Sequence, residues 1–401
     1  MTAAGVRAPP GPFRPGFWRS PLRGPWLTTL LGLALLVPLA GVVVTGFLSH
    51  AAYEPDLGTN AIVARGRDFQ PLVLGWPTRP SWLYALTQGL HVTVGIVSVP
   101  LLLAKLWSVI PRLWAWPPAA SPAQALERLT ILALVGSAAF EFATGIVNVQ
   151  LWYPFRFGFV RAHYYGAWIF VSALVLHVGV KLPTMRAALR TRAQVLTAPA
   201  GTISRRGFFG LVGGATGALL VVTAGQSIGG PLRHLALLAP RGRTYGDGPG
   251  DFAVNKTAAT AGITAAQISS GWRLELRAAR ALSLSRAALL ARAQTAATLP
   301  IACVEGWSTT QHWSGVPLAD LAALAGLPDA GTVHVRSLQA HGAFTQVTLS
   351  RAQIHDPRSL LALRVNGADL SLDHGFPARI VVPAAPGVHC TKWVASMEFR
   401  A

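Results

Sequence analysis

Five long apolar stretches in the first 230 residues constrain this chain more than any other feature. Each is near the roughly 20 residues that a helix needs to cross a bilayer. A bilayer offers no water to backbone N–H and C=O groups, so apolar stretches of this length are expected to be helical. The sequence predicts a transmembrane α-helical bundle of four helices and a fifth anchor helix, at roughly Pro25–Leu48, Leu83–Val109, Leu129–Leu151, Ala162–Leu182 and Phe208–Ile228.

Residues 231–401 have a different pattern, in which short apolar runs alternate with Gly, Pro and Asp. Runs of this kind predict strands bounded by turns. We expect a mixed α+β domain here, with short helices over Ser285–Ala291 and Pro317–Leu324. The expected strands are Pro300–Val304, Val333–Leu338, Phe344–Leu349 and Arg379–Pro383.

The basic residues between the apolar stretches predict how the chain is oriented. Thirteen Lys and Arg lie on the side of the N-terminus and five on the other side. The positive-inside rule therefore puts the N-terminus in the cytoplasm of a bacterium. Five spans of the inner (cytoplasmic) membrane then carry residues 231–401 to the periplasmic face. No cleavable signal precedes the first span, which is expected to remain as an anchor.

Residues 1–24 are rich in Pro, Gly and Arg and contain no acidic residue, which predicts a disordered cytoplasmic tail. The net charge of +19 is spread through the chain, and much of it lies between apolar stretches. It therefore reads as a topology signal, and we expect no nucleic-acid partner. Two cysteines in 401 residues exclude a disulfide framework.

Four histidines lie in or beside the apolar stretches: His50, His91, His163 and His177. Ionisable side chains at membrane depth are costly and are usually functional. The 14 residues from His163 to His177 correspond to a rise of about 21 Å and nearly four full turns, so both rings face one side of a helix. Such a pair is typical of bis-histidine ligation of one or two haems b.

The haem pairing is open at this stage. His91 with His163 fits an outer haem. If the second span lies deeper, His91 pairs with His177 and His50 with His163. The competing interpretation is that these are interfacial histidines that only form hydrogen bonds. Glu141, in the third span, either relays protons for quinone chemistry or hydrogen-bonds a neighbouring helix.

Residues 25–185 resemble the four-helix b-type cytochromes that serve bacterial formate dehydrogenases and hydrogenases. The resemblance rests on Leu90-His91-Val92 and on the spacing of His163 and His177. It implies a haem-binding transmembrane domain over residues 25–197. Those cytochromes carry a further ligand near the inner end of the first helix, where this chain has Gly24-Pro25-Trp26.

Residues 198–230 join the two parts. Ser204-Arg205-Arg206-Gly207-Phe208-Phe209 precedes the fifth apolar stretch. It resembles a twin-arginine signal, which implies that the twin-arginine export machinery carries a folded, cofactor-loaded domain across the membrane. The competing interpretation is an ordinary basic flank.

Three motifs in the last 170 residues resemble the sulfite-oxidase family of molybdopterin proteins, with the periplasmic methionine-sulfoxide reductase branch nearest. They are Cys303-Val-Glu-Gly-Trp-Ser308, Trp313-Ser-Gly-Val-Pro-Leu318 and Asp373-His-Gly-Phe-Pro-Ala-Arg379. The resemblance covers residues 235–400 and implies a molybdopterin-binding oxidoreductase domain over 231–401. It implies that Cys303 is the catalytic thiolate ligand of molybdenum. It also implies that the cofactor is held by Asn255, Ser337, His374, Arg379, Thr391 and Lys392.

These residue types suit that chemistry, because a guanidinium offers a planar fork and an ammonium a point charge to phosphate. Two departures from the family pattern matter. Val304–Ser308 lacks the arginine that follows the cysteine in sulfite oxidases, which argues against sulfite. The chain ends at Ala401, without the dimerisation domain of those enzymes.

Three further residues have open roles. Cys390 is either a redox thiol or a packed small residue, and the packed residue is favoured. His312 and His341 are weaker candidates for the substrate pocket.

The expected function is a membrane-bound molybdenum oxidoreductase with haem b. Electrons pass from membrane quinol through haem to molybdenum, and then to a small or protein-bound substrate outside the cytoplasm, such as a sulfoxide. One alternative is a sulfite or other substrate dehydrogenase that feeds quinone. The other is a non-catalytic electron-transfer cytochrome, against which Cys303 argues.

Overall fold

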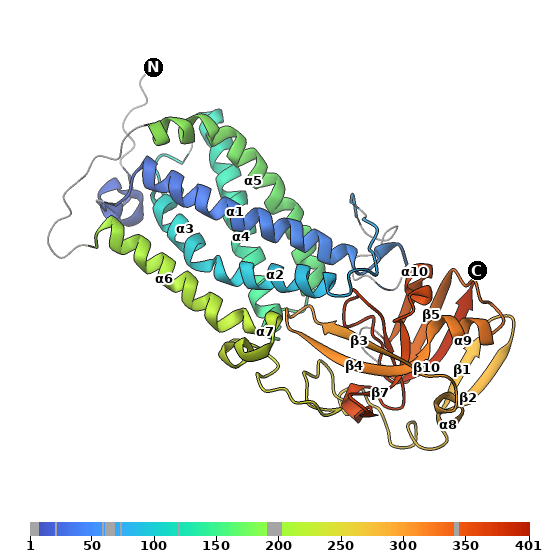
Figure 1. Ribbon diagram of the computed structural model, residues 1–401. Coiled ribbons are helices and arrows are strands. Elements are labelled where there is room, and N and C mark those ends of the chain that lie inside the picture. Colours follow the sequence, from blue (N-terminus) through green and yellow to red (C-terminus); the bar gives the residue numbers. More distant parts are fainter. Residues whose placement is uncertain are drawn as a thin grey trace. The chain divides into compact units, whose positions relative to one another are not determined.

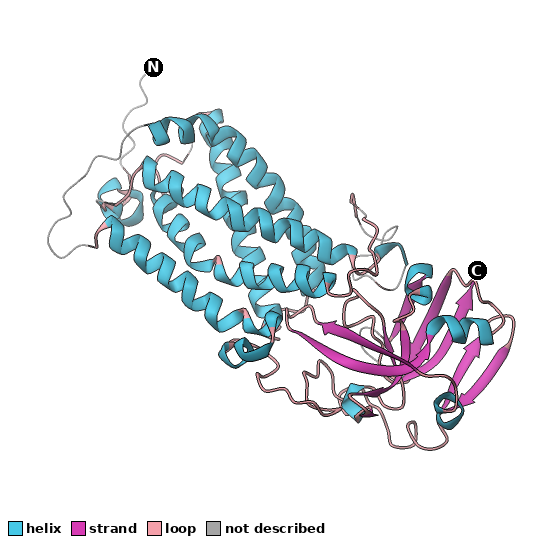
Figure 2. Ribbon diagram, in the orientation of Figure 1, coloured by secondary structure: helices cyan, strands magenta, loops and turns pink. Residues whose placement is uncertain are grey.

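The computed structural model describes residues 8–20, 22–57, 60, 69–72, 74–118, 121–190, 203–340 and 345–401. The chain divides into two compact units. The first comprises Met1–Val43 and Val94–Val221, and the second comprises Val44–Thr93 and Val222–Ala401. Among the described residues, all strands belong to the second unit (Figure 2). Residues 44–93, which the sequence assigned to the membrane bundle, therefore group with the C-terminal domain.

Four described helices are long and apolar enough to cross a membrane, or five if α2 and α3 form one span. They are compatible with membrane anchoring. The second predicted span is interrupted at Ser98, whose hydroxyl donates to the Val94 carbonyl at 2.6 Å, and Pro100 follows at the start of α3. Proline at this position begins a new helix because it lacks an N–H. The helices are α1 (Pro25–Ala51), α2 (Leu83–Val97), α3 (Val99–Leu113), α4 (Pro122–Val149), α5 (Phe159–Arg190) and α6 (Arg205–Thr223).

Two apolar clusters hold the first unit together. In one, Leu27 and Leu31 of α1 pack with Ala104 of α3 and with Phe208 and Val212 of α6. In the other, α1 packs against α3, α4 and α5 through Leu35, Leu39, Leu101, Ala138 and Phe170. Small residues such as Ala104 and Ala138 let helices approach closely, which is the usual basis of helix packing in membranes.

The prediction of a disordered tail is wrong for its described residues. Gly11–Phe13 and Pro15–Trp18 form 3-10 turns. The Phe13 ring meets Trp114 edge-on at 5.3 Å, and the Arg23 guanidinium lies 4.3 Å from the centre of the Trp107 ring. Proline restricts the backbone, and the aromatic and cation–π contacts then fix these turns on the bundle.

The second unit contains two five-stranded sheets (Figure 1). The first has the order β2-β1-β10-β5-β6, with strands Ala281–Ser285, Arg273–Arg277, Val394–Arg400, Thr332–Ser337 and Gln346–Ser350. The second has the order β3-β4-β7-β8, with Thr295–Ala302, Ser308–Pro317, Leu360–Val365 and Ala368–Asp369, and β9 (Arg379–Val381) also pairs with β7. The short helices are α7 (Gly225–Ile228), α8 (Arg286–Leu290), α9 (Leu318–Leu324) and α10 (Arg351–His355).

The core of this domain is one large cluster of buried apolar side chains contributed by both sheets. Trp313 of β4 is among its largest buried members, and its indole N–H donates to the Leu299 carbonyl at 3.2 Å. The predicted strands are confirmed as β5, β6 and β9 within two residues, whereas the strand predicted at Pro300–Val304 is β3, which begins five residues earlier. The predicted short helices are confirmed as α8 and α9 within one residue. The mixed α+β class of this domain is therefore confirmed.

Candidate active site

Cys303 lies where β3 ends, in a tight turn that leads into β4. Its N–H donates to the Trp307 carbonyl at 3.0 Å, and the Gly306 N–H donates to the Cys303 carbonyl at 2.9 Å. Gly306 has φ of +89°, a conformation that favours glycine. Burial, reinforced by the nearby Glu305 carboxylate, raises the pKa of the Cys303 thiol to about 12. The sulfur therefore becomes a thiolate only when a metal or another strong positive charge meets it.

The part of α2 that belongs to the second unit, residues 83–93, packs against this turn. The Gln88 side-chain amide donates to the Val304 carbonyl at 2.7 Å. The Ser227 hydroxyl of α7 donates to the Gly306 carbonyl at 2.6 Å. A Cβ added at Gly306 would lie 2.7 Å from the Val92 Cβ. These contacts explain why residues 44–93 group with the C-terminal domain.

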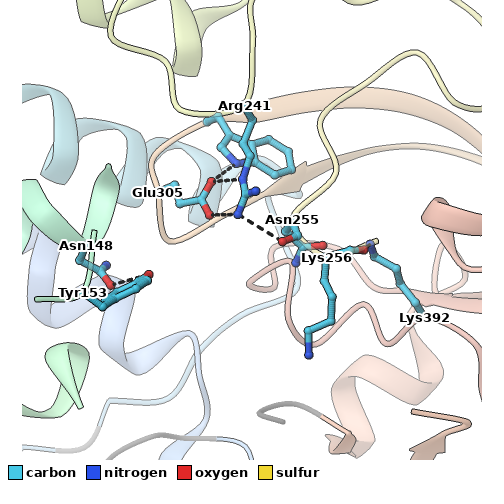
Figure 3. Close-up of polar contacts among 8 residues, drawn as sticks. Asn148, Tyr153, Arg241, Asn255, Lys256, Glu305 and Lys392 are labelled. Atoms are coloured by element: carbon cyan, nitrogen blue, oxygen red, sulfur yellow. Dashed lines mark hydrogen bonds and ion pairs between the residues drawn. The ribbon is translucent and has the colours of Figure 1, made fainter. Parts of the chain in front are cut away.

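A buried ion pair supports the turn from the other side (Figure 3). The Arg241 guanidinium donates through Nε and Nη2 to the two Glu305 oxygens, at 3.0 and 2.8 Å. Arg241 Nη2 also donates to the Asn255 carbonyl at 3.2 Å, and the Trp307 indole N–H donates to Glu305 at 2.8 Å. The predicted cofactor residue Asn255 is thereby tied to the residues that follow Cys303.

Arg379 is a buried arginine that joins the 373–379 segment to the loop before Thr391. Its Nη1 and Nη2 donate to the carbonyls of His374 and Cys390, at 3.0 and 3.1 Å. Its Nε has no hydrogen-bond partner among the described residues. Burial lowers the pKa of the guanidinium to about 10. A buried cation with an unused donor is costly unless an anion meets it.

His374 and Thr391 leave two more buried polar atoms without partners in the described chain, namely His374 Nε2 and Thr391 Oγ1. The His374 ring stacks on Phe252 with 3.7 Å between ring centres. Burial, with the Arg379 charge as the next cause, lowers the pKa of His374 to about 3. The imidazole is therefore neutral, and one nitrogen is available to a ligand.

Lys392 and Ser337 complete the group. Lys392 Nζ donates to the carbonyls of Lys256 and Asp373, both at 2.8 Å, and the Ser337 hydroxyl donates to the Lys392 carbonyl at 2.8 Å. Burial, followed by the Arg379 charge, lowers the pKa of the Lys392 ammonium to about 6. A buried phosphate would restore its charge.

The closing loop and the cysteine strand are joined at Gly387, whose N–H donates to the Ala302 carbonyl at 2.7 Å. A Cβ at Gly387 would lie 2.8 Å from that carbonyl oxygen. The loop that holds Thr391 and Lys392 is therefore held one residue from Cys303. These hydrogen-bonded segments carry three unpartnered buried polar atoms, the Arg379 cation, the Lys392 amine and the Cys303 thiol, a set that fits a phosphorylated, metal-bearing pterin.

Cys390, His312 and His341 had open or weaker roles in the sequence. Cys390 is buried and its carbonyl accepts from Arg379, as expected of a packed small residue. His312 lies on the exposed face of β4, where its Nδ1 is 2.9 Å from the Thr298 hydroxyl. His341 lies outside the described residues.

The candidate haem ligands His163 and His177 lie in the first unit, and His50 and His91 lie in the second. In the first unit, His163 Nδ1 lies 3.0 Å from the Thr144 hydroxyl and 3.2 Å from Glu141 Oε2. Glu141 therefore contacts a neighbouring helix, and its Oε1 lies over Gly166 of α5. His177, further along α5, interacts electrostatically with Lys105 and Lys181.

In the second unit, the His91 ring packs against Gly46, where an added Cβ would lie 2.8 Å from Cε1. His50 Nε2 lies 3.0 Å from the Gln70 amide nitrogen. Glycine at position 46 thus makes room for the His91 ring.

One family model and several known proteins are similar to parts of this chain. Residues 261–401 match the family model of the oxidoreductase molybdopterin binding domain. Sulfite oxidase of Arabidopsis thaliana is 34% identical over 100 residues, which is 21% of this chain and 25% of that protein. Mitochondrial sulfite oxidase of Homo sapiens is 37% identical over 104 residues, 24% of this chain and 19% of that protein.

A third relative is YedZ1 of Azospira oryzae, whose provisional name is that of a protein-methionine-sulfoxide reductase subunit. It is 32% identical over 95 residues, covering 24% of this chain and 35% of that protein. The chain thus spans about a third or less of each of these relatives. The sulfane dehydrogenase SoxCD of Paracoccus pantotrophus is similar with 24% identity over 33% of this chain and 38% of that chain, with a TM-score of 0.30, a value that carries no argument about fold.

Residues 261–401, which lie in the second unit, therefore form an oxidoreductase molybdopterin binding domain with sequence similarity to sulfite oxidases.

Proposed function

We propose that this chain is a membrane-bound molybdenum oxidoreductase that passes electrons from membrane quinol, through haem b, to an oxidised substrate outside the cytoplasm. The observation that carries the proposal is the buried thiol of Cys303 together with the unpartnered polar atoms of His374, Arg379 and Thr391, whose loop is tied to the cysteine strand by the Gly387–Ala302 hydrogen bond. When bound there, the cofactor supplies two-electron redox chemistry, usually with transfer of an oxygen atom.

The roles of the chain's own residues follow from their contacts. Cys303 offers the thiolate, and the α2 contacts with Val304 and Gly306 fix the direction of its sulfur. Arg379, Lys392 and Thr391 offer charge and hydrogen bonds to the cofactor's phosphate and pterin. Asn255 and Ser337 help to position that group. The Asn255 carbonyl is tied through Arg241 to the Cys303 turn, and the Ser337 hydroxyl donates to Lys392 of the closing loop.

Haem ligation is proposed for His91, His163 and His177. The contacts of His163 Nδ1 with Thr144 and Glu141 support a ligand role, because haem-binding imidazoles are oriented by a hydrogen bond at the other nitrogen. His50 is the weakest candidate, because its Nε2 already contacts the Gln70 side-chain amide at 3.0 Å. The proposed location is the inner membrane of a bacterium, with export of the second unit by the twin-arginine machinery.

The test uses the full chain purified from its membrane. Molybdenum near one per chain and haem iron of one or two are expected, with haem reduced by quinol and reoxidised by a sulfoxide. Cys303→Ser should keep quinol-driven haem reduction and lose reoxidation by substrate, whereas Cys390→Ser should keep both. Iron without molybdenum, in cells able to make the cofactor, would contradict the proposal.

A further inference from the structure

Two buried tyrosines from the ends of α1 and α2 lie beside the cysteine turn within the second unit. Tyr53 is 8% exposed and Tyr84 is 1% exposed. Their rings meet edge-on with 6.3 Å between centres, and both pack against Ala302, the residue before Cys303. Both phenols lie near Cys303 and near each other.

His389 of the closing loop is the third member of this group. Its ring meets Tyr53 edge-on at 5.5 Å, and the neighbouring Val388 packs against the same cluster. The ring is fully buried and the Asn60 backbone lies near it, but neither nitrogen makes a hydrogen bond of normal geometry to a described residue. Burial lowers the pKa of His389 to about 4, so the imidazole is neutral. Buried polar groups that lack partners usually await a ligand or ordered water.

The basic side chains of the site have other partners, which are Glu305 for Arg241 and the proposed cofactor for Arg379 and Lys392. Arg241 is paired with Glu305, and Lys392 donates to two carbonyls. Arg379 donates to the His374 and Cys390 carbonyls. The wall made by the tyrosines and His389 is therefore uncharged but offers hydrogen bonds. Such a wall favours an uncharged oxygen acceptor, because a buried dianion would lack a compensating charge.

We propose that Tyr53, Tyr84 and His389 form a substrate-oxygen pocket next to Cys303, two of whose three side chains come from the helix ends that flank the membrane. The pocket takes a neutral oxo-compound, and its phenols donate hydrogen bonds to the substrate oxygen. This inference rests on the proposed function, because Cys303 marks where the metal binds. The catalytic domain would then be incomplete without residues 44–93.

The first test asks whether Tyr53 and Tyr84 cover the cysteine segment, and it needs no enzyme turnover. The full chain with Cys390→Ala is made in cells that lack the cofactor, and the alkylation rate of Cys303 is measured. Tyr84→Ala and Tyr53→Ala should raise this rate at least about tenfold, because each removes a ring that covers the cysteine segment. Tyr84→Phe, which keeps the ring, and Tyr153→Ala, on the α4–α5 connection, should leave it unchanged. An unchanged rate in both alanine variants overturns the proposed wall.

The second test uses the loaded enzyme. Tyr84→Phe and Tyr53→Phe should each lower kcat/KM for a sulfoxide about 10- to 100-fold, the usual effect of losing one hydrogen bond in a buried site. Molybdenum content and haem reduction by quinol should stay at the wild-type level. Normal kcat/KM in both variants overturns the pocket while leaving the proposed function intact. A wild-type protein without molybdenum overturns the proposed function, and the alkylation result still decides whether the wall exists.

Discussion

Replacing Arg241 with Met tests whether the buried pair with Glu305 supports the cysteine turn. The Glu305 side chain is 5% exposed and the Arg241 side chain 24% exposed. Removing one partner of a buried pair costs about 3–5 kcal/mol, because the other charge stays buried. The partial exposure of Arg241 and the remaining Trp307 hydrogen bond favour the low end, about 3 kcal/mol. For a domain of this size, each kcal/mol shifts the unfolding midpoint by about 2–4 °C, which predicts a loss of about 6–12 °C.

Cysteine alkylation during heating is the assay. Among the described residues, both cysteines are buried in the second unit, so their reaction reports unfolding of that unit rather than of the helix bundle. The double variant Arg241→Met with Glu305→Gln should recover more than half of the loss, because a neutral amide still accepts from Trp307. A midpoint within about 1 °C of wild type for Arg241→Met would refute the reasoning.

Three further predictions follow from the closing loop. Gly387→Ala should lower cofactor retention and stability, measured by molybdenum content and Cys390 alkylation, whereas Gly271→Ala, whose added Cβ meets only the Ser269 hydroxyl at 3.5 Å, should change neither. The depressed pKa of His389 means that the unfolded chain binds the proton first, so stability should fall by up to about 3 kcal/mol as pH drops from 6.5 to 4. In denaturant titrations, His389→Gln should weaken the dependence of the unfolding free energy on pH. An unchanged pH dependence would contradict the assignment of this effect to His389. Because the pKa of empty Lys392 is about 6, cofactor binding at neutral pH should take up a proton, and affinity should weaken as pH rises above 6; Lys392→Met should remove this dependence in reconstitution assays.

The motif residues of the catalytic domain were predictable because local patterns encode them. Cys303 follows an apolar run and precedes a glycine, and it lies in the turn that this pattern indicates. Residues 303–308 and 373–379 also lie in order along the chain, and the structure brings them into one group. In contrast, β4 was missed because Ser308–Pro317 is rich in Ser, Thr, Gln and His, and it becomes a strand through pairing with β3 and β7.

The contribution of residues 44–93 was not predictable from periodicity. An apolar stretch that contains Tyr84 and Gln88 reads as a membrane span, whether it faces lipid or protein. The sequence did contain one signal for this packing, namely polar side chains inside the apolar stretches, because such side chains usually contact protein. Ser49 and Thr87 illustrate it, since the Ser49 hydroxyl donates to Thr87 Oγ1 at 3.2 Å. Which partner these side chains meet depends on long-range packing that no local pattern specifies.

The most direct test of the central claim is X-ray absorption at the molybdenum edge of the purified full chain. If Cys303 supplies the thiolate, Cys303→Ser should lose one sulfur neighbour of molybdenum relative to wild type, and Cys390→Ser should keep the wild-type number. The same number of sulfur neighbours in Cys303→Ser and wild type would contradict the account.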